Sequence, residues 1–590
     1  MSAACNRTAT LTHDVGPTRD SKMTWQAAGN VGRQVAKCAT TAAALTVWVT
    51  SICAAPATAA PASAFAFASA STQSGQSQAR LQRTAHQPRA RQHGSRPDAS
   101  LSTEADLLDA NDARFFLTRV GFAPDDAELA QYVGLTREQA VDKVLAGTRT
   151  EALSPLPEWV LEPIPSRDVR KSWTDDQRRA EQRRRGQRYD ELRAWWVREM
   201  LSTTTPLTER MTLFWHNHFT SGEDKVSYPQ LMAQQNMLLR RDALGNFGEL
   251  LHDVAKDPAM LQYLDGASNR KGKPNENFAR EVMELFTLGE GHYSQRDVTE
   301  AARAYTGWSL DPDAQSYVWR ANQHDDGEKT VLGQTGPFDG DQVLDILLAQ
   351  PETATFVTTK LWREFVSDTP DPARIAPIAA QFRASHYDIK VALRGLFLTD
   401  AFWSDDERGV LVKSPAEFVV GTLREFDIGY DNTAPFVAQI RTLGENLFYP
   451  PNVKGWPGGT SWINSSTLLA RKQFVEQLFR ATEAANLKRM NHASDARLAV
   501  NAASGGVESG QPMQRSAARV GRAGEGGVRF DIDTWLARYN TTPTSRPGLS
   551  VELQMQHAVL PLAPVDAIET DSTASAYLQA LLMDPAYQLK

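Results

Sequence analysis

Apolar residues recur at helical spacing along most of this chain, and this pattern limits what it can fold into. In the segment ERMTLFWHNHF, large side chains fall at i, i+3, i+4, i+7 and i+8, namely Met211, Phe214, Trp215, His218 and Phe219. Similar patterns predict helices over 167–200, 206–219, 228–243, 246–256, 277–288, 295–308, 341–349, 352–367, 371–384, 388–400, 413–427, 433–444 and 466–486. Strands and helices do not alternate, and there is no clean internal repeat. We therefore predict an all-α, multi-helix globular domain.

Strand signals are few. The strongest is a short β-hairpin that pairs 317–320 with 330–332 around the turn Asp325-Asp326-Gly327. A second helix-free stretch, 450–462, is a long loop rich in Trp, Pro and Gly.

The N-terminal region has the pattern of a secretory signal. Arg33 and Lys37 supply a basic segment, 39–54 an apolar core, and a small-residue cleavage site ends at Ala59. Met23 is a plausible true start, because the residues before it are polar. The alternative is a membrane anchor, but this apolar run is short for a span. We expect an exported protein, periplasmic or extracellular, with no stable membrane span after cleavage.

Export with cleavage would also limit the chemistry. All three cysteines lie in the first 53 residues, so the mature chain would have no disulfide and no cysteine nucleophile. No strand-led G-x-G-x-x-G motif or P-loop is present, so no nucleotide cofactor is expected.

The chain carries a formal charge of -7, and residues 1–104 hold ten Lys or Arg against four Asp or Glu. The remaining body is therefore more acidic still, which argues against nucleic-acid binding.

Composition divides the chain into five parts. We expect a signal region over 1–60, a disordered Ala/Ser/Gln/Arg tether over 61–104 and the main helical domain over 105–490. A flexible Gly/Ser/Arg-rich insertion over 491–530 would follow, and a C-terminal helical segment, 531–590, would pack on the main domain.

Two histidines of the ERMTLFWHNHF helix are candidate site residues. His216 and His218 lie about 200° apart on a helix, so they would chelate one metal only if the helix unravelled at Asn217. His218 faces the apolar layer. A histidine in that position is more commonly a core residue satisfied by one hydrogen bond than a metal ligand. His216 lies nearer the edge and is the less constrained candidate.

Glu281 is a candidate acid–base or metal-binding group. It lies in the helical segment NENFAREVMELFTLG, where Asn275 or Asn277 can cap the start and Gly289 the end. A carboxylate at the rim of an apolar face has a raised pKa, which suits proton transfer or metal ligation. The alternative is a structural ion pair.

Two loops add further candidates. His324 and Asp325 lie in the polar turn HDDGEK, which would either build a site or merely form a turn. Trp456 and Trp462 lie in the Pro/Gly loop and would either stack on a ligand such as a sugar or pack on the core as a plug.

Several ordered motifs carry a family resemblance. The strings RMTLFWHNHFTSG, DPAMLQYLDG, NENFAREVMELFTLG, YTGW, HDDGEKTVLG, PPNVKGWPGG and DPAYQLK resemble the bacterial family called domain of unknown function 1800, over about 107–490 and the last 60 residues. The resemblance implies an exported, largely helical protein whose family has no established activity. It also implies a partner, an exported alkaline-phosphatase-like protein encoded nearby. The Gly-rich 491–530 segment departs from the family pattern.

These observations lead to two hypotheses of different classes. In the first, the chain is a hydrolase-like enzyme acting on a surface glycan or on a phosphate or sulfate ester. Its pocket would combine His216, Glu281, His324 and Asp325 with Asn275, Asn277, Trp456 and Trp462. The centre would be one divalent metal, held by His216, His218 and Glu281, or an acid–base pair. In the second, a non-catalytic surface or assembly protein uses the same residues as a structural polar network. The first requires His216, Glu281 and His324 to meet at one cavity.

Overall fold

The computed structural model describes residues 107–482, 527–569 and 571–590. The predicted signal region and tether, and most of the predicted insertion, lie outside the described residues. The described chain belongs to one compact unit, Asp98–Lys590. Within the described ranges, no helix is long and apolar enough to cross a membrane.

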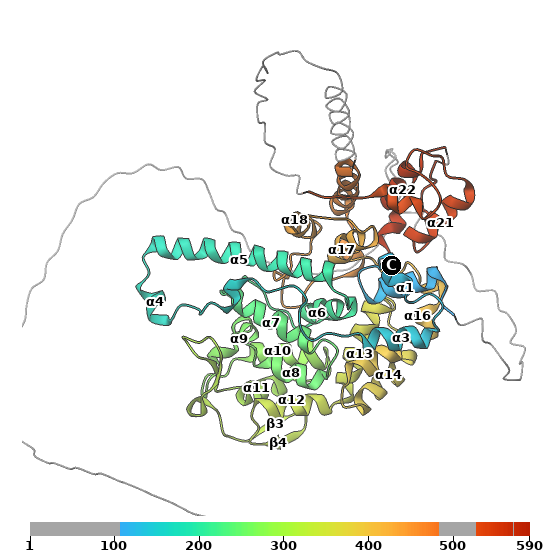
Figure 1. Ribbon diagram of the computed structural model, residues 1–590. Helices are drawn as coiled ribbons and strands as arrows, with labels where there is room; N and C mark the ends of the chain where they lie inside the picture. The colour runs from blue at the N-terminus through green and yellow to red at the C-terminus, as the bar shows by residue number, and fades with distance from the viewer. Residues whose placement is uncertain (1–106, 483–526, 570) are drawn as a thin grey trace, which may run out of the picture. The chain divides into compact units, whose positions relative to one another are not determined.

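Helices dominate the described chain, which confirms the predicted all-α class (Figure 1). The α-helices are α1 (Ala110–Val120), α2 (Asp126–Leu129), α3 (Arg137–Ala146), α4 (Arg167–Ser172), α5 (Asp175–Ser202), α6 (Pro206–His218), α7 (Pro229–Arg241), α8 (Phe247–Ala255), α9 (Pro258–Tyr263), α10 (Glu276–Glu281), α11 (Gln295–Ala304), α12 (Gly340–Ala349), α13 (Pro351–Phe365), α14 (Pro372–Ala384), α15 (Ile389–Phe397), α16 (Asp400–Trp403), α17 (Pro415–Glu425), α18 (Ala434–Thr442), α20 (Ile532–Ala537), α21 (Leu549–Val559) and α22 (Ala574–Met583). A further helix covers 465–482. Short 3-10 turns are η1 (Glu158–Leu161), η2 (Gly266–Ser268), η4 (Ala321–Gln323), η5 (Asp405–Glu407), η6 (Gly459–Trp462) and η7 (Pro585–Gln588), and η3 (Val282–Thr287) is a π-helix.

The helix predicted over 167–200 is in fact two, α4 and α5. The break falls at Trp173 and Thr174, where a capping box starts α5. The Thr174 hydroxyl accepts the backbone N–H of Gln177 at 3.3 Å, and the Gln177 side chain accepts that of Thr174 at 2.8 Å. Such reciprocal capping favours a new helix start at this point.

The predicted hairpin pairing is wrong, because each of its two strands has another partner. Strand β2 (Tyr317–Trp319) pairs with β1 (Trp308–Leu310), and β3 (Lys329–Val331) pairs with β4 (Gln334–Gly336), both antiparallel. Leu332 and Gly333, which connect β3 to β4, have φ values of 47° and 80°. Positive φ at both loop residues is the geometry of a tight type I′ turn, which pairs β3 with the strand that follows it.

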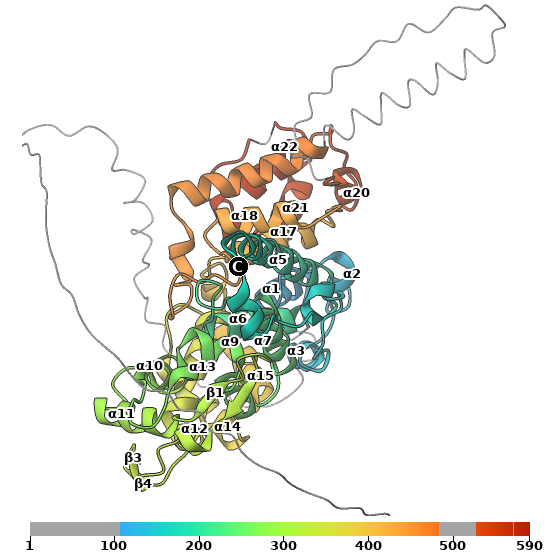
Figure 2. The same cartoon turned by 90° about the vertical axis from the view of Figure 1, so that its left-hand side faces the viewer.

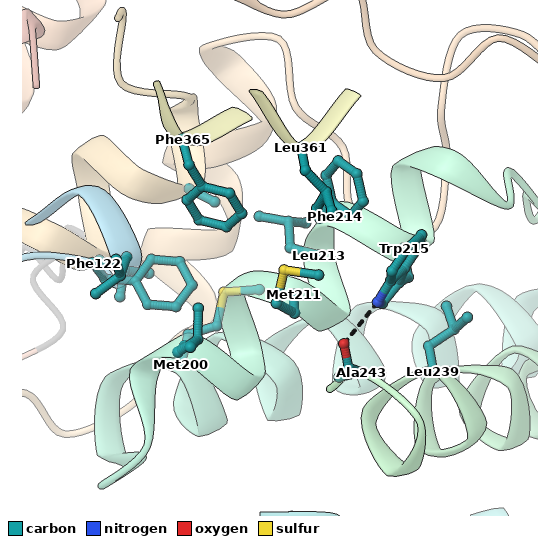
Figure 3. Packing of buried hydrophobic residues seen from close by; sticks show 14 of the residues in the cluster. Phe122, Met200, Met211, Leu213, Phe214, Trp215, Leu239, Ala243, Leu361 and Phe365 are labelled. Atoms are coloured by element: carbon teal, nitrogen blue, oxygen red, sulfur yellow. Dashed lines mark hydrogen bonds between the residues drawn. The ribbon is translucent and has the colours of Figure 1, made fainter. Parts of the chain in front are cut away.

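Helix α6 lies in the core, and all its residues except Asn217 are buried. Figure 3 shows Met211, Phe214 and Trp215 of α6 among side chains from distant parts of the chain, including Leu361 and Phe365 of α13. The Trp215 indole N–H donates to the Ala243 carbonyl oxygen at 2.9 Å. Helix α5 runs beside α17 and α18 (Figures 1 and 2).

The C-terminal segment packs on α1 and α17. In Figure 1 the red helix α21 lies beside the blue α1, and the two are in contact. Leu589 forms an antiparallel bridge with Val412, and the Lys413 N–H donates to the Gln588 carbonyl oxygen at 2.8 Å. The Tyr587 hydroxyl lies 2.9 Å from Thr422 Oγ1 of α17. The last residues of the chain therefore pair with the segment that leads into α17.

Candidate functional site

His216 is buried in an aromatic environment. Its ring centroid lies 5.4 Å from that of Trp196, 5.3 Å from Phe448 and 5.7 Å from Trp456. Burial lowers its pKa to about 3, so the imidazole is neutral at physiological pH. Its Nε2 has no hydrogen-bond partner within the part of the chain that the structure describes. The sequence placed His216 at the edge of its helix; in the fold, α5 and the 448–456 segment cover that edge.

His218 lies in a different environment, beneath the π-helix η3 and α13. Its Nε2 is 3.1 Å from the Phe286 carbonyl oxygen, and its Nδ1 is 3.0 Å from Lys360 Nζ. Because a carbonyl only accepts, Nε2 carries the proton and Nδ1 accepts from Lys360. Burial, with Lys360 beside it, holds the pKa of His218 well below 6.5. His218 is thus a buried neutral histidine whose two nitrogens are both engaged.

His324 and Asp325 are held by structural contacts. His324 Nδ1 donates to the Thr306 carbonyl oxygen at 2.8 Å, and its ring lies 4.9 Å from that of Trp319. The carboxylate of Asp325 accepts two bonds from Arg303, at 2.8 and 3.2 Å. This hydrogen bonding to Arg303 lowers the pKa of Asp325 to about 2. The turn is therefore tied to α11 by an ionised pair.

Asn275 and Asn277 connect α10 to the turn before it. The Asn275 side chain accepts the Asn277 N–H at 3.0 Å and donates to the Asp265 carbonyl oxygen at 3.2 Å. The Asn277 amide donates to the Leu264 carbonyl oxygen at 3.2 Å. Both side chains are engaged in holding the backbone.

Glu281 lies where α10 passes into η3. Partial burial, with Glu284 nearby, raises its pKa. Among the described residues its carboxylate has neither a hydrogen bond nor an ion pair. Short π-helical segments often occur at functional sites, and the sequence predicted a regular helix here. Glu281 therefore keeps the properties that made it a candidate, unlike His218, His324 and Asp325.

The predicted metal centre is not assembled. His216, His218 and His324 each have their own neighbours, drawn from different elements. Within residues 107–482, 527–569 and 571–590, no group of three or more His, Cys, Asp or Glu is placed to hold a metal ion. Neither the metal set of His216, His218 and Glu281 nor a metal-binding cluster of His216, Glu281 and His324 is therefore observed among the described residues.

Trp456 and Trp462 are not exposed platforms. Their exposed fractions are 5% and 7%, and the loop that carries them packs on the core. Both nevertheless line a cavity of about 80 Å³, between the end of α6, α13 and the start of α17. That is room for several water molecules or one small polar group.

Two carboxyl groups, Glu417 and Glu445, line this cavity. Burial and the nearby charge of Glu417 raise the pKa of Glu445 to about 7, although the Ala416 N–H donates to it at 2.8 Å. Burial alone would also raise the pKa of Glu417, but Arg210 and Lys590 hold it below its ordinary value. Below about pH 7, Glu445 is therefore protonated while Glu417 is ionised.

Arg210 and Lys590 keep Glu417 ionised. Arg210 Nη2 lies 2.6 Å from Glu417 Oε1 and 2.5 Å from Glu364 Oε1, and Lys590 Nζ pairs with the same Glu417 oxygen. The other oxygen of Glu417 accepts the Ser414 N–H at 2.8 Å, as part of a capping box. Burial and the neighbouring Arg210 lower the pKa of Lys590 to about 8.

Sequence reasoning missed this charged cavity. The string Ser414-Pro-Ala-Glu417 has the form of a capping box, which indicates a helix start and no chemistry. Glu445 lies in a short polar stretch after α18 with no motif around it. The available signal was the C-terminal string DPAYQLK, which ends in the ionisable residue Lys590 and indicates an anchored tail.

Asn217 connects the ERMTLFWHNHF helix to the tryptophan loop. Its Oδ1 accepts the Trp456 N–H at 2.7 Å. Gly455 has φ 78°, and a Cβ there would lie 2.1 Å from Asn217 Oδ1. We expect Gly455→Ala to destabilise the protein by about 1–3 kcal/mol from backbone strain, with a further cost for the clash. Thermal unfolding followed by tryptophan fluorescence measures this loss.

Gly272→Ala is the matched control, because Gly272 has the same φ of 78° as Gly455 and a Cβ added there would meet nothing within 4 Å. It carries the backbone cost without the clash. Equal losses of stability in the two variants would show that the contact with Asn217 contributes nothing.

Comparison with known proteins identifies a family but no characterised relative. No curated protein matches the chain, and no solved structure matches it either. The family model described as "Protein of unknown function (DUF1800)" matches residues 115–589, which include α6, the tryptophan loop, Glu417 and Glu445. This match covers most of the chain and confirms the resemblance seen in its motifs, so the chain belongs to the DUF1800 family.

Proposed function

We propose that this protein is an exported, hydrolase-like enzyme in which Glu445 is the general acid–base. The observation that carries the proposal is the pair of carboxyl groups in one cavity whose pKa values are pushed apart. Such a split is typical of sites where one acid donates a proton while the other stays ionised. A group with a pKa near the working pH is also the most effective proton carrier.

The surrounding residues suit a transfer of this kind. Glu417 is fixed by Arg210, Lys590 and the Ser414 N–H, so its role is to set the proton affinity of Glu445. Glu445 would protonate the leaving oxygen of the substrate and then accept a proton from the attacking water. Arg363, which is exposed and lines the same cavity, would attract an anionic part of the substrate.

The size of the cavity limits the substrate. A volume of about 80 Å³ admits only the reacting group, so the rest of the substrate would lie outside, along Arg363, Asp368 and Trp462. We propose a glycosidic or ester bond of a cell-surface polymer as the substrate.

Export is supported by the signal-like sequence over 33–59. The family resemblance alone supports a partner, an exported alkaline-phosphatase-like protein encoded nearby.

The test is hydrolysis of 4-nitrophenyl glycosides, phosphate, sulfate and acetate by the purified protein, with and without added divalent metal. We expect at least one substrate to be turned over, and Glu445→Gln to slow that reaction by about 10²- to 10⁴-fold, the usual contribution of a general acid–base. Glu552→Gln is the matched control, because Glu552 is buried on α21 and does not line this cavity. Full activity in Glu445→Gln would contradict the proposal.

The alternative is a non-catalytic surface or assembly protein. It is favoured by the internal contacts of His218, His324 and Asp325, which are those of a structural polar network. In that case the charged cavity only fixes the C-terminal tail to α17. No turnover of any of these substrates by the wild-type protein, with Glu445→Gln altering stability alone, would favour this alternative.

A further inference from the structure

A second, larger cavity of about 310 Å³ lies beside α1, at the end of α21. Its lining includes the apolar residues Phe115, Leu560 and Leu589 and the cations Lys413 and Arg114. The volume is at the lower end of the range for small-molecule sites, which usually combine an apolar wall with a few polar groups. Lys590 lines both cavities, but Glu445 and the two tryptophans do not line this one.

Lys413 is a buried cation without an anionic partner in direct contact. Its exposed fraction is 8%, and its backbone is held by the Gln588 carbonyl oxygen and by Arg471. Within the described ranges, its Nζ makes no hydrogen bond or ion pair and lies 4.1 Å from the centroid of the Tyr587 ring. A buried ammonium group with only a cation–π contact retains most of its desolvation cost.

Arg114 is a second such cation. It projects from α1 and is half-buried, and its Nε is buried without a hydrogen-bond partner among the described residues. The same part of the chain provides no ion pair for its guanidinium. Arg114 and Lys413 therefore bring two unpaired positive charges to one cavity.

The other charged groups of this cavity are already engaged. Arg408 pairs with Asp112 and with Asp405. Asp109 caps α1 by accepting two backbone N–H groups, each at 2.8 Å. Glu425 accepts the Tyr587 hydroxyl at 3.2 Å; burial raises its pKa although the charges of Lys413 and Arg114 lower it, and among the described residues it makes no hydrogen bond or ion pair with either cation. The acidic groups of the cavity thus leave Lys413 and Arg114 in need of an acceptor.

We infer that this cavity binds a small amphipathic anion, with a carboxylate between Lys413 and Arg114 and an apolar body against Phe115, Leu560 and Leu589. The carboxylate would supply the acceptors that both cations lack, in a partly desolvated site where charged hydrogen bonds are strong. Because of the apolar wall, small inorganic anions would bind more weakly than an anion that carries an apolar body. This inference does not depend on the catalytic role of Glu445.

Octanoate is the probe, measured by isothermal titration calorimetry on the purified full-length protein. Octan-1-ol and octylammonium are the matched neutral and cationic controls. We expect saturable binding of octanoate and no comparable binding of the other two. Lys413→Met and Arg114→Gln should each weaken octanoate binding by about ten- to a hundredfold, the usual effect of losing one charged hydrogen bond.

Lys171→Met is the matched control, because Lys171 lies on α4 and lines neither cavity. It should bind octanoate like the wild type. If Lys413→Met fails to fold, Arg114→Gln and the discrimination among the three probes still decide the question. The inference is overturned if octanoate does not bind saturably, if octan-1-ol binds as well, or if the folded variants bind octanoate within twofold of the wild type.

Discussion

Replacing Arg240 with methionine is expected to lower the free energy of unfolding by about 3–5 kcal/mol, because it leaves a buried carboxylate without its counter-charge. Arg240 Nε lies 2.5 Å from Glu209 Oε1, and Nη2 lies 2.8 Å from Oε2, so the pair is bidentate. Both side chains are almost fully buried, and Trp196 Nε1 donates to the same carboxylate at 3.0 Å. Denaturant unfolding followed by tryptophan fluorescence measures the change.

The double variant Glu209→Leu/Arg240→Met is the control for this prediction. It removes both charges and leaves apolar side chains of similar size, a change that is often neutral or stabilising. We therefore expect it to be more stable than Arg240→Met alone. If the double variant is the less stable of the two, packing around the pair matters more than the buried charge.

Glu445→Gln is expected to change how the stability of the protein depends on pH. The folded carboxyl has a pKa of about 7, against 4.5 for the ordinary group, so between these values the folded state holds a proton that the unfolded chain has released. The contribution of Glu445 to the free energy of unfolding therefore falls as the pH rises through that window. The full shift corresponds to about 3 kcal/mol, which is large beside typical net stabilities.

Glutamine does not titrate, yet its amide oxygen can still accept the Ala416 N–H. The wild type should therefore lose about 3 kcal/mol relative to Glu445→Gln between pH 4.5 and 7. Urea unfolding of both proteins at several pH values measures this difference. A constant difference across the window would mean that Glu445 titrates normally, and would also remove the basis for its proposed catalytic role.

The local pattern was sufficient to predict most helices. Helix α6 is predicted over 206–219 and observed over Pro206–His218, because its apolar spacing matches the helical repeat and Pro206 suits the first turn. The helix predicted over 413–427 begins at Pro415, after the Ser414 and Glu417 capping box. Periodicity and capping involve residues within a few positions of each other, so they can be recognised without knowing the fold.

Strand pairing and site geometry were not predictable in the same way. The predicted hairpin failed because periodicity identifies a strand but not its partner, and the turn at Leu332 and Gly333 selected the neighbouring strand. His216 was predicted to lie near a helix edge and to be less constrained than His218, but it is buried, because Trp196 and Phe448 from distant segments pack against it. Glu281 lies next to a π-helix that the apolar spacing did not indicate.

The sequence by itself determined the all-α class, the positions of most helices and, through its motifs, the family. These depend on short-range spacing and on the identity of residues in order. Only the tertiary structure decided which ionisable groups have unusual proton affinities or lack partners. Glu445, Lys413 and Arg114 lie in no motif that indicates chemistry. Their properties arise from burial and from neighbours in the fold, as when the charge of Glu417, distant in sequence, raises the pKa of Glu445. Desolvation and Coulomb interactions depend on distance in space, which the order of residues does not give.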